Sequence, residues 1–209
     1  KCGLIAKKIG MTRVCAEDGV VTPVTLLQVE KQVVTKVLDK DKDGYCAFQL
    51  GYQVKAKKNL TKADHGRLSK VNIKDSYSKF SEFRILDNDS YALGKTISAE
   101  IFKDISSVDV TGISKGKGFQ GAVKRWGASI GRKTHGSRFQ RRPGSLGQCT
   151  TPGRVYKNKH QPGRMGTDKV TVSNVRIIDI DIENNIIAIK GSVPGHKECY
   201  LEVRESNRA

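Results

Sequence analysis

The most reactive side chain of this sequence is Cys149, which lies between His135 and His160. A cysteine beside a histidine is the usual pairing of a nucleophile with its base. A working pair also needs a third group that orients the histidine, and residues 110–167 contain no aspartate or glutamate. The sequence therefore favours a small thiol at Cys149 that is buried or packed on RNA over a catalytic one.

A second candidate is the stretch GKGFQG, in which Gly116, Gly118 and Gly121 match the pattern G-x-G-x-x-G. A dinucleotide site would also need a β-α-β unit and an acidic residue about 20 positions further on. The next acidic residue is Asp168. A nucleotide-binding enzyme is therefore only the alternative hypothesis. These glycines are better suited to a backbone that approaches phosphates closely or adopts positive φ.

The spacing of the cysteines and histidines predicts neither a metal site nor a disulfide framework. The cysteines are scattered and odd in number, and none of them forms a C-x-x-C pair. We predict reduced thiols, no metal, no cofactor and no enzymatic activity. The residues concerned are Cys2, Cys15, Cys46, Cys149, Cys199, His65, His135, His160 and His196.

Positive charge is the leading property of the chain, and it is concentrated in one segment. The 209 residues carry 38 Lys and Arg against 21 Asp and Glu, a formal charge of +17. Residues 110–167 hold 13 of these basic residues and no acidic one. Such a tract calls for a polyanion. A membrane is the poorer partner, because no apolar run approaches the roughly 20 residues of a spanning helix.

Residues 112–167, the basic segment, have the composition of an RNA-binding element. They contain 12 of the 21 glycines, too few apolar residues for a core of their own, and no recognition helix for duplex DNA. A DNA-architectural protein is a remote alternative.

Trp126 could pack in a core or stack on a base, and aromatic rings among cations suit unpaired RNA bases. The predicted RNA-binding residues are Lys115, Lys117, Lys124, Arg125, Trp126, Arg132, Lys133, His135, Arg138, Arg141, Arg142, Arg154, Lys157, Lys159 and Arg164.

The elements that would hold this segment are mostly strands. β-branched runs separated by D-G turns fill the first 51 residues. Thr61 and Asp64 could cap a helix running towards Lys79, followed by strands in EFRIL and KTISAEIF. Strands resume after residue 168, with a slip in alternation after Ile177 that suggests a bulge. We expect a turn between Asp39 and Gly44 and a closed β-barrel with insertions.

The order of several motifs resembles a known family. These motifs are GLIAKKIGMTRV, DGYCAFQLG, VDVTGISKGKGFQGAVKRW, PGSLGQCTTPGRV and GRMGTDKVTV. They are similar to the bacterial type of the universal large-subunit ribosomal protein three. The resemblance covers nearly the whole chain and is weakest between residues 55 and 93.

The resemblance implies a mainly β fold with a six-stranded barrel of the translation-protein type. The barrel would take residues 1–111 and 168–209, with a small mixed insertion at about 55–95 and a long irregular extension at 112–167. It also implies binding to large-subunit ribosomal RNA during assembly, an extension directed towards the peptidyl transferase centre, and neighbouring ribosomal proteins. The expected location is the ribosome of the cytoplasm, with an organellar ribosome as the other option.

The same resemblance singles out the loop GSLGQCTTPG. In bacterial members of the family the glutamine of this loop, here Gln148, can be methylated on its amide nitrogen by a glutamine methyltransferase. Resistance to antibiotics of the peptidyl transferase centre would point to residues Ser145 to Thr151. The sequence departs from many bacterial members at Cys149 and Thr150 and in GASIGRK, which bears on the methylation rather than on the family.

Overall fold

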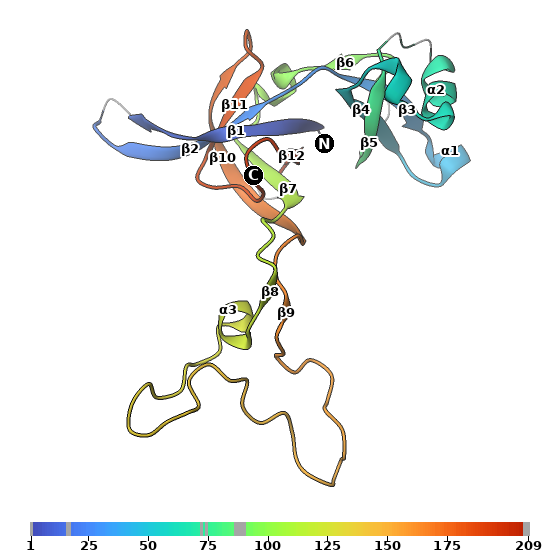
Figure 1. The fold of residues 1–209 in the computed structure, drawn as a ribbon. Helices are drawn as coiled ribbons and strands as arrows, with labels where there is room; N and C mark the ends of the chain where they lie inside the picture. The colour runs from blue at the N-terminus through green and yellow to red at the C-terminus, as the bar shows by residue number, and fades with distance from the viewer. Residues whose placement is uncertain (1, 16–17, 72, 74, 86–90, 207–209) are drawn as a thin grey trace. The chain divides into compact units, whose positions relative to one another are not determined.

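The computed structural model describes residues 2–15, 18–71, 73, 75–85 and 91–206. The chain divides into two compact units. The first unit comprises Lys1–Ile113 and Lys169–Ala209, and the second unit comprises Ser114–Asp168. Figure 1 shows strands throughout the first unit and little regular structure in the second.

The first unit contains a closed antiparallel β-barrel, as the sequence predicted (Figure 1). Its strands follow one another around the barrel in the order β1-β12-β7-β10-β11-β2. Sequence-distant segments therefore lie side by side, and the C-terminal strand β12 pairs with both β1 and β7. The bounds are β1 Gly3–Cys15, β2 Val21–Gln28, β7 Ser107–Ile113, β10 Lys169–Asp181, β11 Ile186–Lys190 and β12 Tyr200–Glu205.

Apolar side chains that alternate along these strands fill the barrel. Leu4, Leu27, Val110 and Ile187 are fully buried, and each such side chain contributes about 2 kcal/mol relative to exposure. The predicted bulge is confirmed, because the register of β10 against β11 shifts between Ile177 and Asp179. The shift returns the next apolar residue of β10 to its face.

A four-stranded sheet in the order β5-β4-β3-β6 completes the first unit. The helix α2 (Lys62–Ser69) contacts β5. Thr61 caps this helix, because its hydroxyl accepts a hydrogen bond from Asp64 N at 3.2 Å. The strand bounds are β3 Gln32–Leu38, β4 Ala47–Val54, β5 Tyr77–Arg84 and β6 Thr96–Ile97.

Three local predictions in this region were wrong. The helix after Thr61 ends at Ser69 instead of continuing to Lys79, because the chain enters β5 at Tyr77. The turn after Asp39 contains a short helix, α1 (Lys40–Asp43), ended by Gly44 at φ 83°. KTISAEIF is a strand only at Thr96–Ile97 and then forms the 3₁₀ helix η2 (Ala99–Phe102), while η1 spans Lys57–Asn59. The end of EFRIL, at residue 86, lies outside the described residues.

One hydrophobic core joins the barrel to this sheet. The rings of Phe48 and Tyr91 stack with centroids 4.0 Å apart, and both residues share a cluster with Leu4 and Leu201 of the barrel. A fully buried glutamine, Gln32, strengthens the junction. Its Oε1 accepts from Ile5 N at 3.0 Å, and its Nε2 donates to Ile5 O at 3.2 Å. The amide thus takes the place of a neighbouring strand.

Candidate nucleic-acid interface

The second unit begins with a narrow two-stranded neck formed by residues 114–121 and 163–168. Strand β8 (Phe119–Gln120) pairs with β9 (Gly163–Arg164). Just before β8 and just after β9 in the chain, Lys117 N donates to Met165 O and Met165 N donates to Gly118 O, both at 2.9 Å. These bonds hold the two limbs of the chain together where the basic segment starts and ends.

Gly166 is required in the neck for two reasons. It has a φ of +79°, a conformation that residues with a Cβ rarely adopt. A Cβ at this position would also lie 2.1 Å from the backbone oxygen of Lys115 on the opposite limb. The glycine therefore lets the two limbs of the neck approach each other, a use that the sequence analysis did not anticipate.

The neck continues into a short helix, α3 (Ala122–Trp126), that the sequence did not predict. We expected no helix between Gly121 and Asp168, because five residues are too few to show a helical period. Ala122 is buried, and Gly127 ends the helix at φ 69°. Helix α3 places Lys124, Arg125 and Trp126 beside the neck, so the base of the basic segment is ordered rather than wholly irregular.

Trp126 lies in a small cluster at the base of the basic segment and is not part of the hydrophobic core. Its ring stacks on that of His160, with centroids 4.6 Å apart and planes at 9°. Its Nε1 donates to Gln161 O at 2.9 Å. The same carbonyl accepts from Arg125 Nη1 at 3.0 Å. The side chain of Trp126 nevertheless remains 46% exposed.

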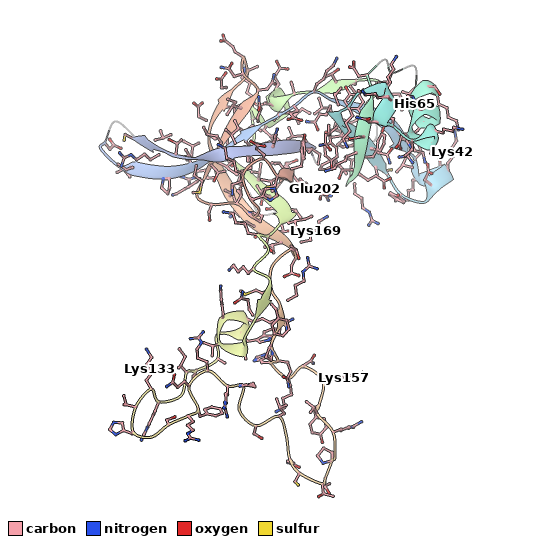
Figure 2. The ribbon with its side chains drawn as sticks, viewed as in Figure 1. Lys42, His65, Lys133, Lys157, Lys169 and Glu202 are labelled. Carbon is pink, nitrogen blue, oxygen red and sulfur yellow. The ribbon has the colours of Figure 1, made fainter. Side chains whose placement is uncertain are left out.

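The predicted RNA-binding cations surround this base and the loops beyond it. Residues 127–162, all of which the structure describes, form turns and bends without helix or strand. In Figure 2, Lys133 and Lys157 lie on different limbs of this region. Every predicted RNA-binding residue is exposed except Arg125, which is half-buried. Within the described part of the chain, the ion pairs lie in the first unit, and none involves a cation of the basic segment.

Exposed aromatic rings lie among these cations. Phe119 is 78% exposed, and Phe139 and Tyr156 are each about half exposed. The guanidinium carbon of Arg154 lies 5.7 Å from the ring centroid of Tyr156. Rings and guanidinium groups that are both open to solvent match the faces of unstacked RNA bases.

Comparison with known proteins agrees with this geometry. The family model described as Ribosomal protein L3 matches residues 81–183. The large ribosomal subunit protein uL3 of Alkaliphilus metalliredigens (strain QYMF) is 45% identical over 202 residues, which are 97% of this chain and 96% of that protein. The chain belongs to the ribosomal protein L3 family. It is therefore a structural constituent of the large ribosomal subunit and not an enzyme, and nothing supports the nucleotide-binding alternative.

The glutamine singled out in this L3-family protein lies on an open loop. Gln148 is exposed and borders a hollow of about 500 Å³ lined by Leu146, Gly147, Gln148, Cys149, Gly153, Arg154 and Val155. The only hydrogen bond recorded for the Cys149 thiol within the described residues is from the Thr150 hydroxyl, at 3.8 Å. His160 stacks instead on Trp126. Cys149 is also exposed rather than buried. Among the described residues, no hydrogen bond joins its thiol to His135 or His160, so the structure does not assemble the Cys–His pair considered from the sequence.

The perturbed titratable groups of this L3-family protein belong to the first unit and are structural. Burial raises the pKa of Tyr77 to about 12, with the carboxylate of Asp75 as a further cause. A hydrogen bond from Lys31 lowers the pKa of Asp75, and the two groups are 2.6 Å apart. Burial also raises the pKa of Tyr200, which donates to Glu30 Oε2 at 2.8 Å. None of these groups lies in the basic segment.

Among the described residues, no group of three or more His, Cys, Asp or Glu side chains is arranged to hold a metal ion. Nor does any described helix combine the length and apolar character needed to cross a membrane.

Proposed function

We propose that the basic segment of this L3-family protein binds large-subunit ribosomal RNA and acts as a set of fixed counter-ions for it. The proposal rests on a segment that contains 13 basic residues and no acidic residue. All 13 basic side chains are exposed except that of Arg125. Cations replace the mobile ions that condense on a phosphate backbone, and the release of those ions drives binding. The protein positions RNA and transfers no proton or group itself.

The residues of the segment divide the work by their chemistry. The lysines supply point charges to phosphates, and the arginines can also form paired hydrogen bonds with them. The lysines are Lys115, Lys117, Lys124, Lys133, Lys157 and Lys159, and the arginines are Arg125, Arg132, Arg138, Arg141, Arg142, Arg154 and Arg164. His135 faces solvent and can donate to a phosphate. Trp126 offers a ring for stacking. In line with the resemblance, we place the tip of the segment near the peptidyl transferase centre, beside other proteins of a cytoplasmic ribosome.

The salt dependence of RNA binding tests this proposal. The affinity of the full chain for large-subunit RNA should fall steeply as salt rises, and each lost phosphate contact should make the slope shallower by about 1. Arg154→Gln, Lys157→Gln and Lys159→Gln together should therefore flatten the slope by about 3. The matched control replaces three exposed lysines of the first unit, Lys40, Lys42 and Lys58, with glutamine. Equal effects of the two triple variants would contradict the proposal.

Sedimentation of a lysate tests the assignment in the cell. The protein should run with the large subunit in a gradient, and the arginine-lysine triple variant should shift towards the top. A wild-type protein that stays at the top while large subunits run intact would overturn the proposal.

We also propose that a glutamine methyltransferase modifies Gln148. The support is the family resemblance together with the exposure of this side chain on an open loop. Mass spectrometry of the peptide holding Gln148, from subunits isolated from the native source, should show a mass increase of one methyl group. An unmodified peptide would show that Cys149 and Thr150 do not provide the context that such an enzyme reads.

A further inference from the structure

The base of the basic segment contains a ring stack that the protein orders by itself. Trp126 on α3 and His160 on the other limb lie nearly parallel, 4.6 Å apart between centroids. Neither ring is buried, because 46% of Trp126 is accessible and His160 is exposed. A stack that serves only packing would exclude water, whereas this stack keeps part of its π surface open.

A hydrogen bond fixes Trp126 and leaves only the ring surface of this residue for a ligand. The indole N–H is the single donor of a tryptophan side chain, and in Trp126 it is used by Gln161 O. Trp126 therefore has no donor left with which to read the edge of a base. A ligand held here would be recognised by stacking, which is tolerant of base identity.

A cation beside the stack is held there by the absence of a side chain at Gly163. A Cβ at this position would lie 2.4 Å from Nη1 of Arg125. The bare backbone lets the guanidinium reach Gln161 O while its central carbon lies 4.8 Å from the Trp126 ring centroid. Because His160 and Arg125 both lie against the Trp126 ring, the exposed ring of His160 offers the aromatic surface that is left for a base. The site thus combines this surface with a fixed positive charge, as a nucleotide requires for its base and its phosphate.

We propose that the Trp126–His160 stack is a binding site for one unpaired nucleobase, with Arg125 facing the phosphate of that nucleotide. This inference rests on the proposed function, because it assumes that the basic segment meets RNA. The base must be unpaired, since the faces of a base inside a helix are covered by its neighbours, whereas a bulged or looped base can be splayed out. His160 completes the site as a positioning and stacking residue.

The test uses the full chain and two RNA hairpins that differ in one feature. One hairpin carries a single bulged 2-aminopurine, whose emission falls when it stacks on a ring, and the other carries 2-aminopurine paired within the stem. The wild-type protein should quench the bulged probe and leave the paired probe nearly unchanged. His160→Asn should remove most of the quenching and weaken binding of the bulged hairpin about tenfold.

Matched variants make the result specific. His196→Asn makes the same change at an exposed histidine of the first unit, outside the predicted RNA-binding residues, and should leave quenching unchanged. His160→Tyr keeps a ring and should retain the quenching, which covers the case in which asparagine merely loosens the packing around Trp126. Equal effects of His160→Asn and His196→Asn, or loss of quenching in His160→Tyr, would overturn the inference.

The wild-type binding data separate this inference from the proposed function. Steep, salt-dependent binding of both hairpins without a preference for the bulge would overturn the inference alone. Binding of neither hairpin, even at low salt, would overturn both proposals.

Discussion

At the scale of single residues, the side chain of Gln32 makes a sharp prediction about stability. Its amide satisfies both backbone groups of Ile5 in a fully buried position. Gln32→Met keeps the size of the side chain but leaves a buried N–H and a buried C=O without partners, at about 1–3 kcal/mol each. Urea denaturation should therefore show a free energy of unfolding lower by about 2–6 kcal/mol.

Gln28→Met is the control for this change, because Gln28 is exposed at the end of β2. Its effect should stay within about 0.5 kcal/mol. If the two variants were equally stable, the amide of Gln32 would not be acting as a substitute strand.

Tyr77 makes a prediction about pH at the same scale. Its pKa is raised from the ordinary value of 10 to about 12, chiefly by burial. The folded state therefore keeps a proton that the unfolded state loses, so the free energy of unfolding should fall as pH rises from 10 to 12. Tyr77→Phe removes this contribution and should show a shallower fall in that range when unfolding is followed at pH 9 and 11. An identical decline in both proteins would contradict the assignment.

The residue scale also shows what the sequence could not reveal. The cations of the basic segment were predictable, because their exposure follows from a tract without acidic residues. The partnership of Trp126 with His160 was not, since it joins residues 34 positions apart in the sequence through an irregular chain. Gln32 was missed because a buried glutamine in a β-branched run looks like an ordinary strand residue.

At the scale of elements, the neck should depend on Gly166. Alanine there meets both an unfavourable φ and the backbone oxygen of Lys115, and a rigid backbone cannot move aside as a side-chain tip can. Gly166→Ala should disrupt the β8–β9 pairing. Hydrogen exchange at Lys117 and Met165, which bond across the neck, should speed up strongly, while the melting temperature of the first unit stays nearly unchanged. Gly136→Ala, at positive φ in a loop with open space around it, is the control.

Long elements were predictable from the sequence, and short elements were not. Alternating apolar residues indicate the barrel strands. The break in this alternation after Ile177 also located a bulge. Helices α1 and α3 have four and five residues, which is close to a single turn and leaves no periodic signal. The true end of α2 was missed because tertiary pairing of β5 with β4 decides where the helix must stop.

At the scale of the whole molecule, the first unit should keep its stability when the second unit is removed. Ile113 ends β7, Lys169 begins β10, and the two residues are register partners in an antiparallel pair. An Asn-Gly pair in place of residues 114–168 would close these strands as a two-residue hairpin, the loop that favours this geometry. The shortened protein keeps the whole hydrophobic core of the first unit and should melt within a few degrees of the full chain.

The same shortened protein should lose most of its affinity for RNA. The deletion removes 13 basic residues and one acidic residue, so both the affinity at low salt and the slope of affinity against salt should fall. Calorimetry measures the melting temperature of the shortened protein, and filter binding measures its affinity for RNA at each salt concentration. A shortened protein that melts normally yet binds large-subunit RNA with the original salt slope would place the RNA contacts on the barrel. A shortened protein that fails to fold would show instead that the second unit stabilises the first.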